Sequence, residues 1–186
     1  MCRAVFFIDG SNIYSHLRSV FGNGRVHIPT LCGELTEQGE RFLQWRYYVA
    51  PLSQGTTPAE KASYSAQQRF LQYVRNHRKG ELCLGRFQRD DQGCLREKGV
   101  DVRLSVDLVR MAIHNGYDAA VVLSGDGDIV LAIETVIQDY NKEVFVALPA
   151  AVDAYHIKQA VGQNHFREIT ALIYQRARGA LKASKP

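Results

Sequence analysis

Two uninterrupted runs of apolar residues, 4–8 and 119–123, limit most strongly how this chain can fold. Such runs, with no polar residue at alternate positions, are typical of strands buried on both faces of a sheet. Between them the apolar spacing becomes helical, because residues 101–114 carry a stripe formed by Val102, Val106, Val109 and Ile113. Buried strands that alternate with helices predict an α/β fold with an open, mostly parallel sheet covered on both faces.

The rest of the chain continues this alternation. Further strands are predicted over residues 45–50, 81–87 and 143–148, and further helices over residues 13–21, 58–77, 129–140 and 154–161. The helix that begins at Pro58 is indicated by a capping box in the sequence TPAE. Residues 90–93 (DDQG) predict a turn, and the last twenty residues predict one more helix that frays.

Composition indicates an ordinary soluble protein with one main domain. The chain is 46% hydrophobic and 23% charged, and no linker rich in Pro, Gly or Ser divides it. We expect a domain over residues 1–170 and a basic helix or tail over residues 171–186. No apolar run approaches the ~20 residues of a membrane span, so no membrane partner is expected. Four scattered cysteines without metal-site spacing favour reduced thiols and a cytoplasmic location.

The positive charge is concentrated at the end of the chain. The formal net charge is +4, and residues 167–186 hold five basic residues and one acid, which leaves 18 of each sign in the first 166 residues. A neutral body argues against a histone-like binder, although patches of both signs still allow nucleic acid to bind. We expect the basic tail to lie in solvent.

Acidic residues follow both buried strands. Asp9 ends the first run, and SGDGD (residues 124–128), which contains Asp126 and Asp128, follows the second. The carboxyl ends of parallel strands meet at one edge of a sheet, where ligands bind. Between the two turns in sequence, KGVD (residues 98–101) opens the helix that carries Asp101 and Asp107. We therefore expect a cluster of aspartates at this edge.

Grouped carboxylates raise one another's pKa unless a cation lies among them. Oxygen ligands without His or Cys suit Mg²⁺ or Mn²⁺, and two such ions can hold a phosphodiester and activate a water molecule. The alternative is that each aspartate only caps its helix, Asp101 in particular. Capping alone explains two acidic turns after two buried strands less well.

Other phosphate chemistries lack their motifs. The chain has no P-loop and no dinucleotide-binding GxGxxG after a strand. An aspartyl-phosphate motif DxDxT would need Asp at the position of Ser11, and an integrin-type DxSxS would need Ser at the position of Ile13.

Three motifs together resemble a known family. FIDGSN (residues 7–12), KGVDV (residues 98–102) with Asp107, and SGDGD (residues 124–128) resemble, in this order, the signature of the NYN domain. They are most similar to the LabA-like (DUF88) branch of the PIN-like nuclease superfamily, over roughly residues 3–170. The resemblance implies a PIN-like three-layer α/β/α fold and a metal-dependent ribonuclease that cleaves single-stranded RNA or other nucleic acid.

The resemblance also implies roles for individual residues. The implied Mg²⁺ or Mn²⁺ ligands are Asp9, Asp107, Asp126 and Asp128, and the catalytic set adds Asn12 and Asp101. Asp101 and Asp107 are six residues apart, about 120° around a helix, so they cannot both point the same way from a regular helix. We keep both as candidates.

Cations and hydroxyls near the acidic motifs are the predicted contacts for the substrate. They are Ser11, Arg86, Lys98, Arg103 and Ser124. Arg86, Phe87 and Arg89 mix cations with an aromatic ring, a combination that can bind phosphate and stack a base. Two alternatives stay open, a non-catalytic RNA-binding or regulatory NYN module and a small-molecule phosphohydrolase. The sequence also leaves the oligomeric state open, a homodimer included.

Overall fold

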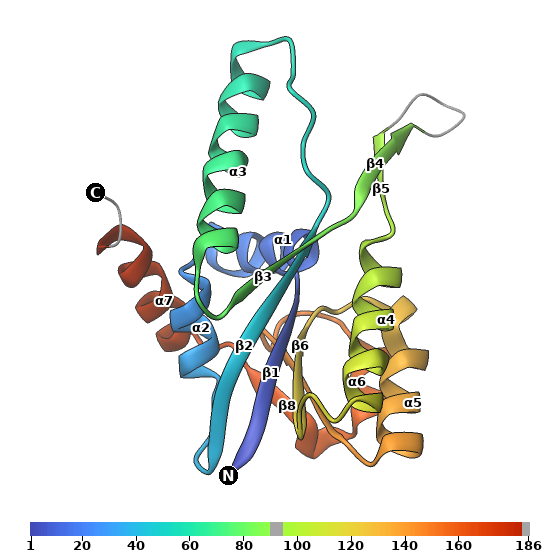
Figure 1. Cartoon of the computed structure of the whole chain (residues 1–186). Coiled ribbons are helices and arrows are strands. Elements are labelled where there is room, and N and C mark those ends of the chain that lie inside the picture. Colours follow the sequence, from blue (N-terminus) through green and yellow to red (C-terminus); the bar gives the residue numbers. More distant parts are fainter. Residues whose placement is uncertain (90–94, 184–186) are drawn as a thin grey trace.

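A six-stranded, entirely parallel sheet forms the centre of the protein in the computed structural model, which describes residues 1–89 and 95–183 (Figure 1). The strands lie in the order β3-β2-β1-β6-β7-β8. Their bounds are β1 Cys2–Asp9, β2 Glu40–Val49, β3 Gly80–Leu84, β6 Ala119–Leu123, β7 Glu143–Leu148 and β8 Phe166–Glu168. The predicted parallel sheet is confirmed.

The two apolar runs form the middle of this sheet. β1 pairs with β6 so that Ile8 lies opposite Leu123, and every side chain in residues 4–8 and 119–123 is fully buried. Both strands therefore end at the same level. Asp9 and Ser124, the next residues along the two strands, are brought to one edge.

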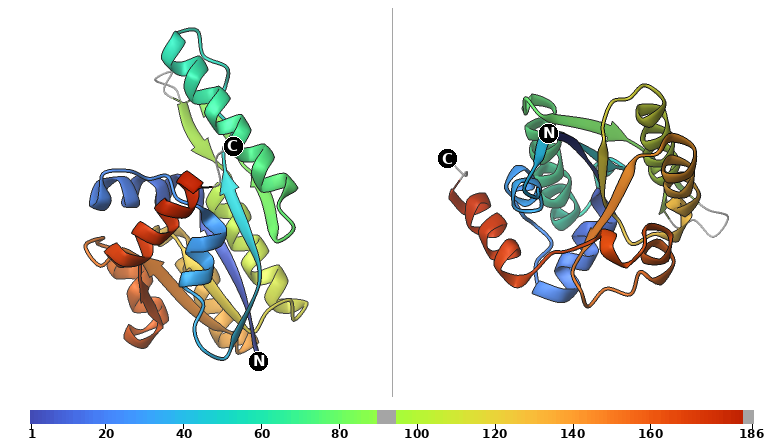
Figure 2. Two further views of the ribbon diagram at one scale, coloured as in Figure 1. Left: turned by 90° about the vertical axis from the view of Figure 1, so that its left-hand side faces the viewer. Right: turned by 90° about the horizontal axis from the view of Figure 1, so that it is seen from below.

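Helices cover both faces of the sheet, as a three-layer α/β/α fold requires. Their bounds are α1 Gly10–Phe21, α2 Ile28–Glu34, α3 Pro58–Asn76, α4 Val100–Ile113, α5 Val130–Tyr140, α6 Tyr155–Val161 and α7 Ala171–Ala183, with short 3₁₀ turns at Gly127–Ile129 and Gln163–His165. α4 and α5 pack side by side on one face, and α1, α2 and α7 lie on the other (Figures 1 and 2). Among the described residues, no helix has both the length and the apolar composition needed to cross a membrane.

The predicted helix over residues 101–114 is present, but its apolar stripe faces outward. Val102 is 67% exposed, and Val106 and Ile113 are also exposed. The buried side of α4 is a second row at helical spacing, formed by Val100, Leu104, Leu108 and Ala112.

The predicted strand over residues 81–87 is divided in two. β3 ends at Leu84, and the chain then leaves the sheet as a hairpin of β4 (Arg86–Arg89) and β5 (Leu95–Lys98). Gly85 permits this change of direction, because a Cβ atom there would lie 2.5 Å from Cγ2 of Val100. The hairpin and α3 both project beyond the carboxyl edge of the sheet (Figure 1). The turn predicted at residues 90–93 lies outside the described residues.

The helix at the end of the chain packs on the body, so the expectation of a tail in solvent is wrong for residues 171–183. Tyr174 and Ala177 are buried, and the His27 amide donates to the Ala177 carbonyl oxygen at 3.0 Å. Arg176 forms an ion pair with Glu34 of α2 at 2.8 Å. α2, which the sequence patterns missed, is the element on which α7 lies.

Replacing Tyr174 with alanine is expected to lower the free energy of unfolding by about 3 kcal/mol. Its ring stacks on Phe21 with 4.4 Å between centroids, and its hydroxyl donates to the Asn23 carbonyl oxygen at 2.9 Å. Tyr174→Phe, which removes only the hydroxyl bond, should cost about 1 kcal/mol. Urea unfolding followed by circular dichroism measures both values.

The exposed Leu172 of the same helix provides the control, since Leu172→Ala should change stability by less than about 0.5 kcal/mol. Equal losses for the two alanine variants would contradict the packing role of α7.

Candidate metal centre

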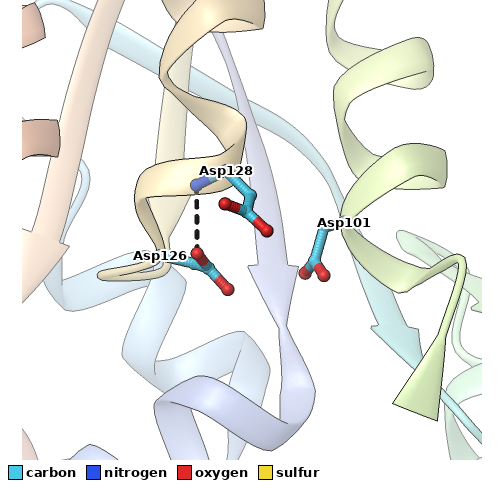
Figure 3. A group of neighbouring side chains, drawn as sticks. All are labelled: Asp101, Asp126 and Asp128. Carbon is cyan, nitrogen blue, oxygen red and sulfur yellow. Dashed lines mark hydrogen bonds between the residues drawn. The ribbon is translucent and has the colours of Figure 1, made fainter.

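Three aspartates converge at the carboxyl edge of the sheet. Asp101 lies in the first turn of α4, and Asp126 and Asp128 lie in the turn that follows β6. One carboxylate oxygen from each lies within 4.8 Å of the other two, and the three side chains point toward one another (Figure 3). Gly99 holds the N-cap position of α4, so Asp101 does not serve as the cap of its helix.

Local hydrogen bonds shape the turn that carries Asp126 and Asp128. The Asp126 carboxylate accepts from the Asp128 amide at 3.0 Å, and the Ser124 hydroxyl oxygen accepts from the Asp126 amide at 3.1 Å. The Gly125 amide donates to Oδ1 of Asn12 at 2.9 Å. Asn12 therefore joins the turn after β6 to the start of α1.

Asp9 lies at the end of β1 beside the three aspartates, and it is only 4% exposed. Its Oδ1 accepts from the Asn12 amide at 3.0 Å, and its Oδ2 accepts from the Ser124 hydroxyl at 3.3 Å. Burial, with a smaller contribution from the charges of Asp101 and Glu97, raises the pKa of Asp9 to about 7. Burial and the charge of Asp126 also raise the pKa of Asp101. Both pKa values are therefore raised mainly by burial and further by the neighbouring carboxylates.

A pocket of about 330 Å³ connects these groups. Its lining residues are Asp9, Ser11, Asn12, Glu97, Val100, Asp101 and Asp126. Glu97 is an acid that the sequence patterns missed. It comes from β5, and its Oε1 accepts from the Ala50 amide at 2.6 Å. Strand β5 (LREK) has no apolar run, so only its position directly before Lys98 and the KGVD motif could have drawn attention to Glu97.

Asp107, which the sequence predicts as a metal ligand, lies outside this cluster of Asp101, Asp126 and Asp128. Its Oδ2 accepts from Nη2 of Arg46 at 3.0 Å and from the Tyr48 hydroxyl at 3.1 Å. Because six residues separate them on one helix, Asp107 points in a different direction from Asp101, and its partners Arg46 and Tyr48 lie on β2. Asp107 thereby fastens α4 to the sheet.

The predicted substrate contacts are divided between the surface and the interior. Ser11 is exposed and lines the pocket, and Arg86 and Lys98 are exposed cross-strand neighbours in the hairpin. Arg103 is exposed on α4, where Nη1 donates to the Leu84 carbonyl oxygen at 3.3 Å. Ser124, also predicted as a substrate contact, is fully buried, and its hydroxyl bonds to Asp9 and to the Asp126 amide.

Comparison with known proteins gives a family and a fold. The sequence model of the NYN domain matches residues 3–168. The chain is also similar to a crystal structure of a protein of unknown function from Vibrio parahaemolyticus, with a TM-score of 0.69 and 20% sequence identity over 91% of this chain and 94% of that chain. At this identity the likeness concerns the fold alone. Among curated proteins, none matches this sequence.

The buried carboxyl of Asp9 should make stability depend on pH when metal is removed. The folded protein holds a proton on Asp9 up to about pH 7, whereas the unfolded chain releases it near pH 4. The free energy of unfolding should therefore fall as the pH rises between about 4 and 7, by up to about 1.4 kcal/mol per unit from this group. In urea titrations with a chelator, the Asp9→Asn variant should lack the part of this fall that comes from the Asp9 carboxyl. The exposed Asp139 supplies the control, and equal slopes for Asp9→Asn and Asp139→Asn would contradict the prediction.

Asp101 and Asp107 should respond differently to removal of their charge. We expect Asp101→Asn to weaken Mn²⁺ binding at least about tenfold, measured by calorimetry, with little loss of stability. Asp107→Asn should instead lower the free energy of unfolding by about 1–3 kcal/mol, because half-buried Arg46 loses a partner. Its Mn²⁺ affinity should stay within about threefold of that of the wild type. Weaker Mn²⁺ binding in a stably folded Asp107→Asn variant would identify Asp107 as a ligand.

Proposed function

The chain belongs to the NYN domain family, within the PIN-like nuclease superfamily, and from this membership we propose that it is a metal-dependent ribonuclease acting on single-stranded RNA. One observation carries the proposal. Asp101, Asp126 and Asp128 bring carboxylate oxygens within 4.8 Å of one another at the edge of the sheet where α/β proteins bind ligands. The proposed reaction is the hydrolysis of phosphodiester bonds.

The donor set fits a hard divalent cation. All three groups are carboxylates, which suit Mg²⁺ or Mn²⁺. Burial is the main cause of the raised pKa of Asp101, and the charge of Asp126, which a cation would neutralise, adds to it. Asp101, Asp126 and Asp128 would hold the ion, and Asp9, which lines the same pocket as Asp101 and Asp126, is proposed as a further ligand. A bound ion of this kind polarises a phosphoryl oxygen and lowers the pKa of a water molecule.

The surrounding residues have supporting roles in this proposal. Asn12 holds the turn of Asp126 in place through the Gly125 amide, and Ser11 offers a hydroxyl at the pocket. Arg86 and Lys98 lie side by side on the hairpin, where they would contact backbone phosphates of a strand that passes the metal centre. The hairpin and α3 project on either side of the edge, a shape that suits an extended polymer (Figure 1).

The sequence also supports more specific assignments of the family branch, the partner and the location. We assign the chain to the LabA-like (DUF88) branch, with RNA as its partner and the cytoplasm as its location. A non-catalytic RNA-binding module would have no use for the three converging carboxylates. A small-molecule phosphohydrolase would have no use for the cations that lie out on the hairpin.

Asp126→Asn is expected to reduce RNA cleavage about a hundredfold or more, because it removes a charge that holds the metal ion. The assay compares labelled single-stranded RNA and DNA, with Mn²⁺ or with a chelator, for the wild type and the variant. The control is Asp139→Asn, which removes an exposed carboxylate at the far end of α5 and should cleave like the wild type. Thermal unfolding verifies that both variants are folded.

Two results would overturn the proposal. Wild-type protein that leaves varied RNAs intact in Mn²⁺ would favour the non-catalytic module. Faster hydrolysis of a nucleotide monophosphate than of an oligonucleotide would favour the small-molecule phosphohydrolase.

A further inference from the structure

A second pocket, of about 390 Å³, lies between α5 and α6. Val130 and Glu134 line it from α5, and His156, Gln159 and Ala160 line it from α6. The spacing of three or four residues on each helix means that one face of α5 looks across the pocket to one face of α6.

This pocket adjoins the turn that carries two of the clustered aspartates. A Cβ atom at Gly127, between Asp126 and Asp128, would lie 3.9 Å from Cβ of His156. A Cβ atom at Gly125 would lie 3.5 Å from Cβ of Ala154, the residue before α6. The start of α6 thus lies against the turn, and His156, which lines the pocket, is the residue that approaches Gly127 between the two aspartates.

The pocket offers hydrogen-bonding groups that the protein itself does not use. Within the part of the chain that the structure describes, no hydrogen bond or ion pair engages the side chains of Glu134, His156 or Gln159. Val130 and Ala160 supply apolar surface between these groups. Tyr155 is 65% exposed beside the pocket, and its ring meets that of His156 edge to face, with 5.5 Å between centroids.

The lining does not suit a phosphate group. It contains the carboxylate of Glu134 and no Lys or Arg. The nearest lysine on α6, Lys158, points elsewhere, because its Nζ donates to the Val152 carbonyl oxygen and lies over the Phe166 ring. A ligand suited to this lining carries no negative charge, donates hydrogen bonds to the Glu134 carboxylate and has a ring that can stack on Tyr155. Nucleobases have these properties, and proteins bind them by stacking on aromatic side chains and by hydrogen bonds to their edges.

We propose that the pocket between α5 and α6 binds the nucleobase next to the phosphodiester held at the metal centre, with guanine preferred. Guanine presents two adjacent donors, N1–H and the N2 amino group, which match the two oxygens of the Glu134 carboxylate. Uracil presents a single ring N–H between two carbonyl oxygens. The carboxylate of Glu134 would repel these oxygens. The exposed ring of Tyr155 stacks on the base. This inference rests on the proposed function and adds a sequence preference to it.

The test uses heptanucleotides of uridine that contain one guanosine or none, with the full-length protein. We expect the guanosine to improve binding about tenfold, measured by fluorescence anisotropy, and to direct cleavage in Mn²⁺ to a bond beside it. Glu134→Gln, which replaces one carboxylate oxygen with a donor, should reduce the preference to about twofold or less. Tyr155→Ala should weaken binding of both RNAs about tenfold. Asp139→Asn, on the same helix as Glu134 but exposed and remote, is the matched control and should keep the preference.

The outcomes separate this inference from the ribonuclease proposal. Equal binding and cleavage of the two RNAs by wild-type protein would overturn the guanine site and leave the nuclease intact. A guanine preference that Glu134→Gln and Asp139→Asn retain equally would also overturn it. A binding preference that Glu134→Gln abolishes, in protein that cleaves neither RNA, would support the base site and overturn the nuclease.

Discussion

The alignment of β1 with β6 is the constraint on which the candidate site depends. Ile8 lies opposite Leu123, so the two strands end together, and the Ser124 hydroxyl reaches Asp9. The Gly125 amide then bonds to Asn12 and joins the two turns. A change of register by one residue would move every buried side chain of either strand to the other face of the sheet. Close packing of fully buried apolar residues thus fixes the positions of the acids that follow them in the chain.

The third part of the site, Asp101, depends on a separate contact at the middle of α4. Asp107 receives hydrogen bonds from Arg46 and Tyr48, which anchor the helix to β2. Because burying the Arg46–Asp107 ion pair costs desolvation energy, the pair adds little net stability. Its main effect is to orient α4. Because it fixes the rotation of α4 about its axis, it directs Asp101 toward Asp126. One charged residue of the helix serves the fold, and the other faces the site.

The sequence predicted those parts of the site that follow directly from buried strands. Asp126 was placed at the edge of the sheet because a continuous apolar run precedes it. The direction of Asp107 was not predictable, since α4 carries two apolar rows at helical spacing and the row that includes Val102 proved to be the exposed one. Glu97 was missed because it reaches the pocket through a hairpin outside the sheet, where no periodic pattern marks a strand.

The distribution of charge explains how a protein with a neutral body could hold a polyanion. Two cations near the chain end already form ion pairs within the fold, Arg167 with Glu40 and Arg176 with Glu34. The net charge of +4 therefore does not measure the positive charge that a ligand can reach. The cations of the hairpin and a metal ion at the aspartates would attract phosphates locally, where field strength depends on position and not on total charge. The pocket between α5 and α6 lacks cations altogether among its lining residues. A strand bound across this surface would therefore have its backbone held by charge on one side of the metal centre and its base held by stacking and hydrogen bonds on the other.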